Sequence, residues 1–451
     1  MLLVALAFIN DRFTGTIGLR GLRKLEVLIL CSIDFKENIL LESLGGLPSL
    51  KTLSAYGSKF EGKHFGKGLC NSTSLEKMYF LGSSLPASFL GNIGTPLKVL
   101  DLTGVDFHDT LHVAQGWCEL KNLEWLSLGQ NNLKGVLPHC LGNLSSLRNL
   151  DLSDNQFEGH ISYLPQLEYL SISNNYFQVP ISFGSFMNHS NLKYIACDNN
   201  ELVPASSFQA PAPKLQLRFF SASSCTSKLL SCEFPTFLHS QYDLVFVDLS
   251  HNKFIGEPFP SWLVENNTKL NRLYLSNASF IGPLQLPQNP IPNLDIIDLS
   301  DNNIHGQVAR NTCLIFPSLQ NFIMANNNLT GCIPLCFGNM SSLAYLDLSN
   351  NHMSCELLEN NLPPVGSLLW YLKLSNNNFT GLLPPSVFNM TKPVYLFLDG
   401  NKFAGEVPGI FSPTLRIVDI SNNLLSGMLP RGIGNSSVFL KGIDLSKNHL
   451  E

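Results

Sequence analysis

Large apolar residues recur along the chain in a short pattern in which apolar and polar positions alternate. Typical segments are LEWLSLGQNNLKGVLP (123–138) and LAYLDLSNNHM (343–353), which share the form Leu-x-x-Leu-x-Leu-x-x-Asn. Alternation with a period of two is the pattern of a β-strand that buries one face. Each copy of the pattern therefore predicts one short strand whose leucines point inward.

The pattern keeps its phase over the whole chain. The asparagine position, called the turn position below, falls at Asp11, Ile33, Ser58, Ser83, Val105, Asn131, Asn155, Asn175, Asn200, Cys225, Asn252, Ala278, Asn302, Asn327, Asn351, Asn377, Asn401, Asn423 and Asn448. These nineteen positions are about 24 residues apart on average, within the range of leucine-rich repeats. Successive strands would lie about 4.8 Å apart in a parallel sheet.

The predicted fold is an α/β-type repeat solenoid, a curved and twisted superhelix with the parallel sheet on its concave face. It forms one leucine-rich-repeat domain over residues 1–451, with no separate second domain. An inward asparagine at the turn can bond backbone groups of its own and neighbouring repeats. Twelve of the nineteen turn positions have it, but the first five do not, so we expect residues 1–110 to be less regular.

Composition narrows the class of partner. Hydrophobic residues make up 44% of the chain, charged residues only 14%, and the net charge is -5. Binding to nucleic acid requires clustered lysine and arginine, so a nucleic-acid partner is not expected. No stretch approaches the ~20 apolar residues of a membrane-spanning helix. The opening MLLVALAFI has no basic start and no small-residue cleavage site, so we expect neither a signal peptide nor a membrane segment.

Catalytic and metal-binding signatures are missing from the sequence. It contains no HExxH, GxSxG, P-loop or GxGxxG phrase, and its 11 histidines show no metal or triad spacing. A row of repeated strands also offers an open curve rather than an enclosed, water-excluded site. We therefore predict no enzyme activity, no catalytic residues, no metal and no cofactor.

The eleven cysteines can be paired by repeat geometry, because residues about one repeat apart lie side by side in a solenoid. Without CxxC spacing they indicate an oxidising compartment rather than zinc. Cys31, Cys70 and Cys197 are interpreted as small buried hydrophobes. The candidate disulfides are Cys118–Cys140, Cys313–Cys336, Cys332–Cys355 and, as a local loop closure, Cys225–Cys232.

Glycosylation sequons are frequent. They fall at Asn71, Asn143, Asn188, Asn266, Asn277, Asn328, Asn339, Asn378, Asn389 and Asn435. Asn328 and Asn378 arise from the repeat's own N-x-T-G phrase, so they are equally well explained as consensus residues.

Residues that point outward from the strands are the candidates for ligand contact, because the fold places no demand on them. Aromatic side chains are concentrated there in two groups, and exposed aromatic rows mark interaction surfaces. The first group is Trp125, Tyr169, Tyr194, Phe219 and Phe246, followed by Arg272 and Tyr274. The second is Tyr345, Tyr371, Lys373, Tyr395 and Phe397. An alternative of equal weight is that these rings only stack on one another along the sheet.

The longer phrase N-x-L/F-x-G-x-x-P, as in Gly135 to Pro138 and Gly381 to Pro384, resembles the plant extracellular class of leucine-rich repeats. That class has a second short strand in each turn. The segments CEFPTFLHSQYDLVFVDLSHNKF (232–254), FPSWLVENNTKL (259–270), GPLQLP (282–287) and DLSDNNIHGQV (298–308) look like plant receptor-like proteins, which are kinase-less cell-surface receptors of the disease-resistance type.

This resemblance implies a ligand-recognition ectodomain at the plasma membrane, in defence or developmental signalling through partner receptor kinases. The implied ligand is a peptide, a glycan or a protein on the concave face. The sequence departs from the family plan in lacking a signal peptide, terminal caps, a non-repeat island and an anchor, which favours an ectodomain fragment. The alternatives are a secreted inhibitor of a cell-wall-degrading enzyme, the outer part of a receptor kinase and a truncated, non-functional product.

Overall fold

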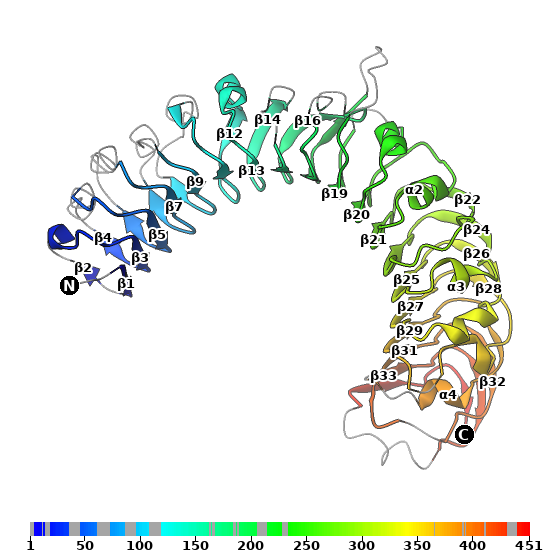
Figure 1. The fold of residues 1–451 in the computed structure, drawn as a ribbon. Coiled ribbons are helices and arrows are strands. Elements are labelled where there is room, and N and C mark those ends of the chain that lie inside the picture. The colour runs from blue at the N-terminus through cyan, green and yellow to red at the C-terminus, as the bar shows by residue number, and fades with distance from the viewer. Residues whose placement is uncertain are drawn as a thin grey trace. The chain divides into compact units, whose positions relative to one another are not determined.

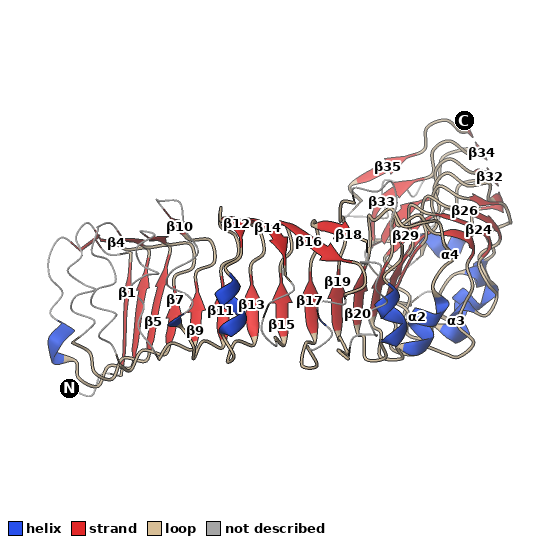
Figure 2. Ribbon diagram, turned by 90° about the horizontal axis from the view of Figure 1, so that it is seen from above, coloured by secondary structure: helices blue, strands red, loops and turns tan. Residues whose placement is uncertain are grey.

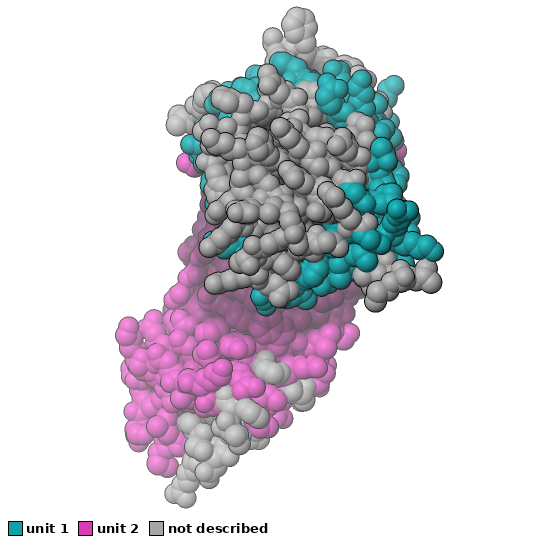
Figure 3. Space-filling model, turned by 90° about the vertical axis from the view of Figure 1, so that its left-hand side faces the viewer, with its two compact units in different colours: residues 1–217, 225–228 teal, residues 218–224, 229–451 magenta. Residues whose placement is uncertain are grey.

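The computed structural model describes most of the chain in two compact units. It covers residues 4–10, 12–13, 19–35, 46–60, 73–85, 96–107, 119–161, 164, 167–183, 186, 189–204, 214–227, 233–364, 366–389, 392, 394–409, 412–430 and 440–451. Unit 1 comprises residues 1–217 and 225–228, and unit 2 comprises residues 218–224 and 229–451 (Figure 3). Each unit is described by itself below, and the single domain over residues 1–451 stays a prediction.

Each unit contains a principal sheet of parallel strands, one from each repeat. In unit 1 its strands are β1 (Ala5–Ile9), β3 (Val27–Cys31), β5 (Thr52–Tyr56), β7 (Lys77–Tyr79), β9 (Val99–Asp101), β11 (Trp125–Ser127), β13 (Asn149–Asp151), β15 (Tyr169–Ser171) and β17 (Tyr194–Ala196). In unit 2 they are β19 (Phe219–Ser221), β20 (Phe246–Asp248), β21 (Arg272–Tyr274), β23 (Ile296–Asp298), β25 (Asn321–Ile323), β27 (Tyr345–Asp347), β29 (Tyr371–Lys373), β31 (Val394–Phe397), β33 (Leu415–Asp419) and β35 (Gly442–Asp444).

The predicted alternation explains this sheet. Leu126 and Leu128 are fully buried. Trp125, which precedes Leu126 in the same strand, faces outward and is 41% exposed. Within each unit the principal strands lie along the inner side of the curved ribbon, and the helical turns lie along the outer side (Figures 1 and 2). The predicted fold class, a solenoid of parallel strands, is confirmed.

Shorter parallel sheets form beside the principal sheet. Unit 1 has β2 (Arg12–Phe13), β4 (Asp34–Phe35), β6 (Lys59–Phe60), β8 (Ser84–Leu85) and β10 (Asp106–Phe107), and a second set of β12 (Lys134–Val136), β14 (Gln156–His160), β16 (Tyr176–Pro180) and β18 (Glu201–Val203). Unit 2 has β22 (Ile281–Pro283), β24 (Asn303–Gln307), β26 (Asn328–Gly331) and β28 (His352–Met353), and then β30 (Thr380–Leu382), β32 (Lys402–Gly405), β34 (Leu424–Gly427) and β36 (His449–Leu450). This is the second strand that the family resemblance implies.

Short helical turns return the chain to the next strand. They are η1 (Leu19–Gly21) and η5 (His139–Asn143) in unit 1, and η7 (Thr236–Ser240), α2 (Ser261–Asn266), α3 (Thr312–Ile315), η8 (Leu335–Asn339), η9 (Glu359–Asn361) and α4 (Pro385–Phe388) in unit 2. Within the described ranges, none of the helices has the length and apolar character needed to cross a membrane.

The turn asparagines form the predicted ladder. Asn377 Nδ2 donates to the carbonyls of Leu348, Leu374 and Ser375 at 2.9–3.3 Å, and its Oδ1 accepts from the amide of Met353 at 3.0 Å. One side chain thus satisfies buried backbone groups of two repeats, which would otherwise be left without partners.

Serine continues the ladder where asparagine is missing near the N-terminus. Ser58 Oγ accepts from the amide of Ile33 at 3.1 Å, and Ser83 Oγ accepts from the amide of Ser58 at 3.1 Å and donates to the carbonyl of Ala55 at 3.0 Å. A hydroxyl has one proton to donate whereas an amide has two, so this part of the ladder holds fewer carbonyls. That residues 1–110 are less regular stays a prediction.

The residue before the turn position has a left-handed backbone in repeat after repeat. Asn174, Asn199, Asp301 and Asn376 have φ between 51° and 57°. Asparagine, aspartate and glycine tolerate this region better than other residues, which explains why they recur there. Some of these side chains also form an exposed row, since Asn174 Nδ2 donates to Asp154 Oδ1 at 2.6 Å and Asn376 Nδ2 donates to Asn350 Oδ1 at 2.9 Å.

Candidate ligand-binding surface

Unit 1 carries one row of outward-facing rings on its principal sheet. Tyr169 and Tyr194 are direct neighbours in the β15–β17 register, and their rings stack with centroids 4.2 Å apart. Trp125 lies two strands away across Asn149, with its ring centroid 6.5 Å from that of Tyr169. Burial raises the pKa of both tyrosines, and the nearby Asp151 contributes in each case. Trp125 is the most exposed of the three, at 41%, and Tyr169 and Tyr194 are half-buried.

Unit 2 begins with a second row. Phe219 and Phe246 stack with centroids 4.2 Å apart, and Tyr274 packs against Phe246 at 5.7 Å. Arg272 is exposed and pairs with Phe246 in the β20–β21 register. Burial raises the pKa of Tyr274, with Asp248 and Asp298 acting in the same direction and Arg272 in the opposite one. The rings at adjacent outward positions, which the sequence predicts to lie side by side, are therefore in contact with one another.

A third row is the largest, and we call it the Tyr371 cluster: Tyr345, Trp370, Tyr371, Tyr395 and Phe397. Tyr345 and Tyr371 stack with centroids 4.1 Å apart. The ring centroids of Tyr395 and Phe397 lie 6.4 and 5.6 Å from that of Tyr371. Burial raises the pKa of Tyr345, and Tyr371 and Asp347 raise it further. Lys373 lies between Asp347 and Phe397 in the strand register.

Trp370 is the member of the cluster that sequence reasoning missed. Its ring meets those of Tyr345, Tyr371 and Tyr395 edge-on at 5.8, 5.8 and 6.0 Å, yet its side chain is 41% exposed. Trp370 lies seven residues before the turn position Asn377 and directly precedes β29, so the alternation within the strand assigns it no face. A signal was available, because a tryptophan stands at a position that is charged in eight consecutive repeats of unit 1.

The recurrent aspartates of the middle strand position support the fold. Asp298 Oδ1 accepts from the amide and hydroxyl of Ser300 at 2.9 and 2.7 Å, and Asp347 does the same with Ser349. These bonds hold the chain at the end of the strand. Burial raises the pKa of Asp298, the bonds from Ser300 lower it, and Asp301 and Asp347 raise it slightly.

Cysteine positions follow from repeat geometry. Disulfides join Cys313 to Cys336 and Cys332 to Cys355, with Cα atoms 5.8 and 5.0 Å apart. Cys140 is also disulfide-bonded, whereas its expected partner Cys118 lies outside the described residues. Cys232, the expected partner of Cys225, and Cys70 also lie outside them. Cys197 is buried, as expected of a small hydrophobe, whereas Cys31 is only partly buried, so the same prediction is wrong for Cys31. In the described part of the chain no group of histidine, cysteine, aspartate and glutamate is arranged to hold a metal ion.

The sequons differ in accessibility. Those at exposed asparagines are Asn143, Asn266, Asn277, Asn328, Asn339 and Asn389. Asn378 is half-buried, and Asn71, Asn188 and Asn435 lie outside the described residues. The side chain of Asn328 already donates to Asn303, and that of Asn277 contacts His251. Use of any of these sites stays a prediction.

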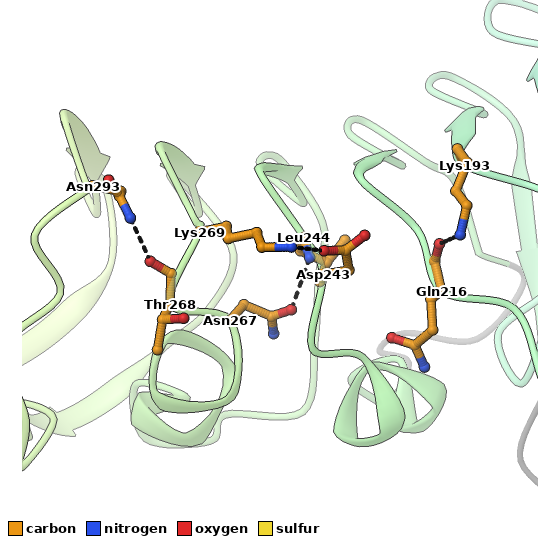
Figure 4. Close-up of polar contacts among 8 residues, drawn as sticks. All are labelled: Lys193, Gln216, Asp243, Leu244, Asn267, Thr268, Lys269 and Asn293. Carbon is orange, nitrogen blue, oxygen red and sulfur yellow. Dashed lines mark hydrogen bonds and ion pairs between the residues drawn. The ribbon is translucent and has the colours of Figure 1, made fainter.

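Polar contacts link neighbouring repeats on the flank of the sheet (Figure 4). In unit 2, Lys269 pairs with Asp243, and Asn267 Oδ1 accepts from the amide of Leu244 at 2.9 Å. In unit 1, Lys193 Nζ donates to the carbonyl of Gln216 at 3.0 Å. These contacts link neighbouring repeats beside the outward strand positions.

Comparison with known families agrees with this geometry. One leucine rich repeat family model matches residues 95–157, and a second matches residues 318–340, 368–390 and 414–436. The curated relatives include Cuscuta receptor 1 of Solanum lycopersicum, 38% identical over 76% of this chain and 31% of that protein. Receptor-like protein 14 of Arabidopsis thaliana is 34% identical over 98% of this chain and 48% of that protein.

The chain belongs to the plant leucine-rich-repeat receptor-like proteins. It spans less than half of the length of both relatives just named. Among solved structures, the PEPR1–AtPEP1 complex superposes with a TM-score of 0.77 at 24% identity, over 99% of this receptor-like protein and 66% of that chain. The Arabidopsis receptor kinase HAESA, in complex with the peptide hormone IDA and the co-receptor SERK1, has a TM-score of 0.67 at 25% identity, over 95% and 75% of the two chains.

Proposed function

We propose that this receptor-like protein binds an extended peptide ligand across the principal sheet of unit 2, at the Tyr371 cluster. Its relatives are named receptors, and HAESA, a structural neighbour, was solved with a peptide hormone. A peptide is favoured over a glycan or a folded protein because the ligand in the HAESA complex is a peptide hormone. The proposal assigns the chain a binding role and no catalytic one.

The observation that carries the proposal is the combination of mutual stacking and exposure in one cluster. Rings that only stabilise strands bury their faces against one another. In the Tyr371 cluster, Tyr345 and Tyr371 do so, but Trp370 keeps 41% of its surface open although it contacts three other rings. A rigid, partly exposed tryptophan among tyrosines is the composition of a binding hot spot. Lys373 adds a cation on the same face.

The wider role is also part of the proposal. The repeats would be extracellular at the plasma membrane, and the bound peptide would promote pairing with a receptor kinase in defence or developmental signalling. This is supported by the names of the relatives and by the presence of a co-receptor in the HAESA complex.

Selection from a library of random linear peptides tests the proposal. A displayed library is enriched on the wild-type chain, and the affinity of the selected peptides is measured for wild type and for Tyr345→Ala, Trp370→Ala and Tyr371→Ala. We expect each change to weaken binding about thirtyfold, the effect of a hot-spot residue. Trp125→Ala is tested in parallel to compare the row in unit 1.

Tyr176→Ala is the matched control, because Tyr176 is 65% exposed but lies on β16 of a short sheet. Circular dichroism checks that every variant is folded. Peptides that bind the three cluster variants as tightly as the wild type would show that the cluster is not the ligand site.

A further inference from the structure

A groove in unit 2 lies away from the principal sheet and has no part in the proposed peptide site. It has a volume of about 820 Å³ and is formed by the segments 356–359, 381–385 and 406–409 of three successive repeats. Its apolar lining includes the exposed Leu358 and Leu382 above the buried Leu357, Leu383 and Val407. Leu358 and Leu382 are 50% and 70% exposed. Large apolar side chains are thus presented to solvent inside a concave surface.

The charged residues of this groove all have one sign. Glu356, Glu359 and Glu406 contribute to its lining and are exposed, and the lining residues within the described ranges include no lysine or arginine. An adjoining groove of about 740 Å³ shares Glu356 and Leu358, and its lining includes Arg310. The negative region is therefore confined to the part between Glu356 and Glu406.

Repeat geometry aligns three of these side chains. Glu356, Leu382 and Glu406 occupy the same position of successive repeats, five residues after the turn position. Each lies over the glycine of the following repeat: a Cβ added to Gly381 would meet Glu356 Cγ at 2.9 Å, and one added to Gly405 would meet Leu382 Cδ2 at 2.5 Å. A Cβ added to Gly427 would likewise meet Glu406 Cγ at 3.1 Å. The result is a row with acidic, apolar and acidic members.

The spacing of the row suits an extended chain. Adjacent repeats are about 4.8 Å apart, so the two glutamates are separated by roughly 10 Å. Three residues of a polyproline II chain, an extended form with three residues per turn and a rise of about 3.1 Å per residue, span about the same distance and bring the side chain back to the same face. A segment with two cationic side chains three residues apart and apolar residues between them would place a charge near each carboxylate and its apolar side chains on Leu382.

The floor beside the row is held rigid. Cys355 precedes Glu356, and it is bonded to Cys332 of the preceding repeat, while Cys336 in that repeat is bonded to Cys313. Cys332, Cys336 and Cys355 line the adjoining groove. A surface fixed before binding loses less conformational entropy when a partner docks.

We propose that this groove docks an extended segment of a partner protein that carries two lysine or arginine side chains separated by two apolar residues. Charge complementarity decides the occupant, because only a cationic segment satisfies Glu356 and Glu406 while it covers Leu358 and Leu382. The site is independent of the Tyr371 cluster.

A pair of synthetic peptides tests the proposal on the full chain. The probe is fluorescein-labelled Gly-Lys-Leu-Leu-Lys-Gly, with Gly-Glu-Leu-Leu-Glu-Gly as its acidic counterpart, and binding is followed by fluorescence polarisation. We expect the basic peptide to bind and the acidic peptide not to. Glu356→Gln and Glu406→Gln should each weaken binding about threefold and their combination about tenfold, the range of exposed ion pairs. Raised salt should weaken the wild-type complex similarly.

Carbodiimide coupling locates the contact, since it links a lysine amine to a carboxylate within reach. Mass spectrometry should find the basic peptide attached to Glu356 or Glu406. Glu158→Gln, an exposed residue of β14 in unit 1, is the matched control and should leave binding unchanged. Leu382→Ser tests the apolar contact, and because Leu382 is exposed its loss should weaken binding without unfolding the chain.

Several outcomes would overturn the proposal. Equal binding of the acidic peptide, coupling at other carboxylates, or the same loss of affinity with Glu158→Gln would each show general attraction to an acidic protein. If the double glutamine variant instead abolishes self-association of the free chain in sedimentation, the occupant is a second copy and not a cationic partner segment. None of these results bears on the Tyr371 cluster, whose variants are tested separately.

Discussion

The turn asparagine has the largest structural task of any single residue in a repeat. Asn377 is buried and bonds four backbone groups, three carbonyls and one amide, from two repeats. Because it occupies a site that alanine fits sterically, its loss would leave those groups buried and without partners.

We therefore expect Asn377→Ala to lower the free energy of unfolding by at least about 4 kcal/mol, since four backbone groups lose a partner and each orphaned buried group costs about 1–3 kcal/mol. Urea denaturation followed by circular dichroism measures this change. Asn376→Gly is the control, because Asn376 is exposed with φ 55°, a conformation that glycine adopts readily. Similar losses in the two variants would contradict the assignment.

Asp298 makes the stability of the folded chain depend on pH. Burial raises its pKa above the ordinary value of 3.8, so the folded state binds this proton more tightly than the unfolded state. The resulting stabilisation is complete below the ordinary value and is lost as the pH rises through the raised folded value. Asp298→Asn removes the titration but keeps an oxygen that can accept from Ser300.

The expected result is that Asp298→Asn becomes more stable relative to wild type as the pH rises from about 3 to about 7. Urea denaturation of both proteins across this range measures the difference. A difference that stays constant with pH would show that Asp298 does not titrate as the structure indicates.

At the scale of the element, the glycine four residues after the turn position lets the short strands pack. Gly381 has φ 82°, and a Cβ there would lie 2.9 Å from Glu356 Cγ. Gly282 occupies the equivalent position with φ 85° but has nothing within 4 Å of an added Cβ. Substitution of either glycine therefore strains the backbone, but only substitution of Gly381 also brings an added Cβ too close to a neighbouring side chain.

We expect Gly381→Ala to destabilise the chain by about 1–3 kcal/mol through strain and, in addition, to displace Glu356. Gly282→Ala should show the strain alone and so the smaller loss. Thermal unfolding of the two variants compares them directly. A larger loss for Gly282→Ala would mean that the contact with Glu356 has no energetic effect.

The same element explains a disulfide. Residues five after the turn position lie over the fourth residue of the next repeat, as Glu356 does over Gly381. In one repeat Cys355 replaces that glycine, and Cys332 lies above it, so the two sulfurs come within bonding range. Sequence spacing could nominate this pair, but only packing of the short strands shows why it forms.

At the scale of the whole molecule, unit 1 has an ion-pair ladder along one edge of its principal sheet. The position seven residues before the turn alternates in charge over eight repeats: Glu26, Lys51, Glu76, Lys98, Glu124, Arg148, Glu168 and Lys193. Lys51 pairs with Glu26 at 3.0 Å, Lys98 with Glu76 at 3.2 Å and Arg148 with Glu168 at 3.7 Å. In unit 2 the same position holds Trp370, between Ala344 and Val394 of the adjacent repeats.

Arg148→Glu would place three glutamates on adjacent strands. We expect a loss of about 1 kcal/mol at low salt, the scale of a like-charge pair directly across strands, and recovery of most of it at high salt. Urea denaturation at about 0.02 M and about 0.5 M sodium chloride measures both. Arg148→Gln, which removes the charge without reversing it, should lose less, and a loss independent of salt would exclude repulsion as its cause.

Much of the fold could be predicted from the sequence because the same pattern of apolar and polar residues recurs in each repeat. The period of two in Leu-x-x-Leu-x-Leu determined the strands, and the spacing of the turn asparagines determined the solenoid and its ladder. The outward rings were also predictable, since strand alternation assigns a face to each residue.

Tertiary structure alone decided which side chains meet. Trp370 joins Tyr345 and Tyr395 because the residue before a strand packs beside the neighbouring strands, a relation that alternation within one strand does not contain. The row of Glu356, Leu382 and Glu406 likewise depends on the stacking of short strands over glycine. Local pattern determines a residue's face, whereas contacts between repeats depend on register and backbone twist that only the packed chain supplies.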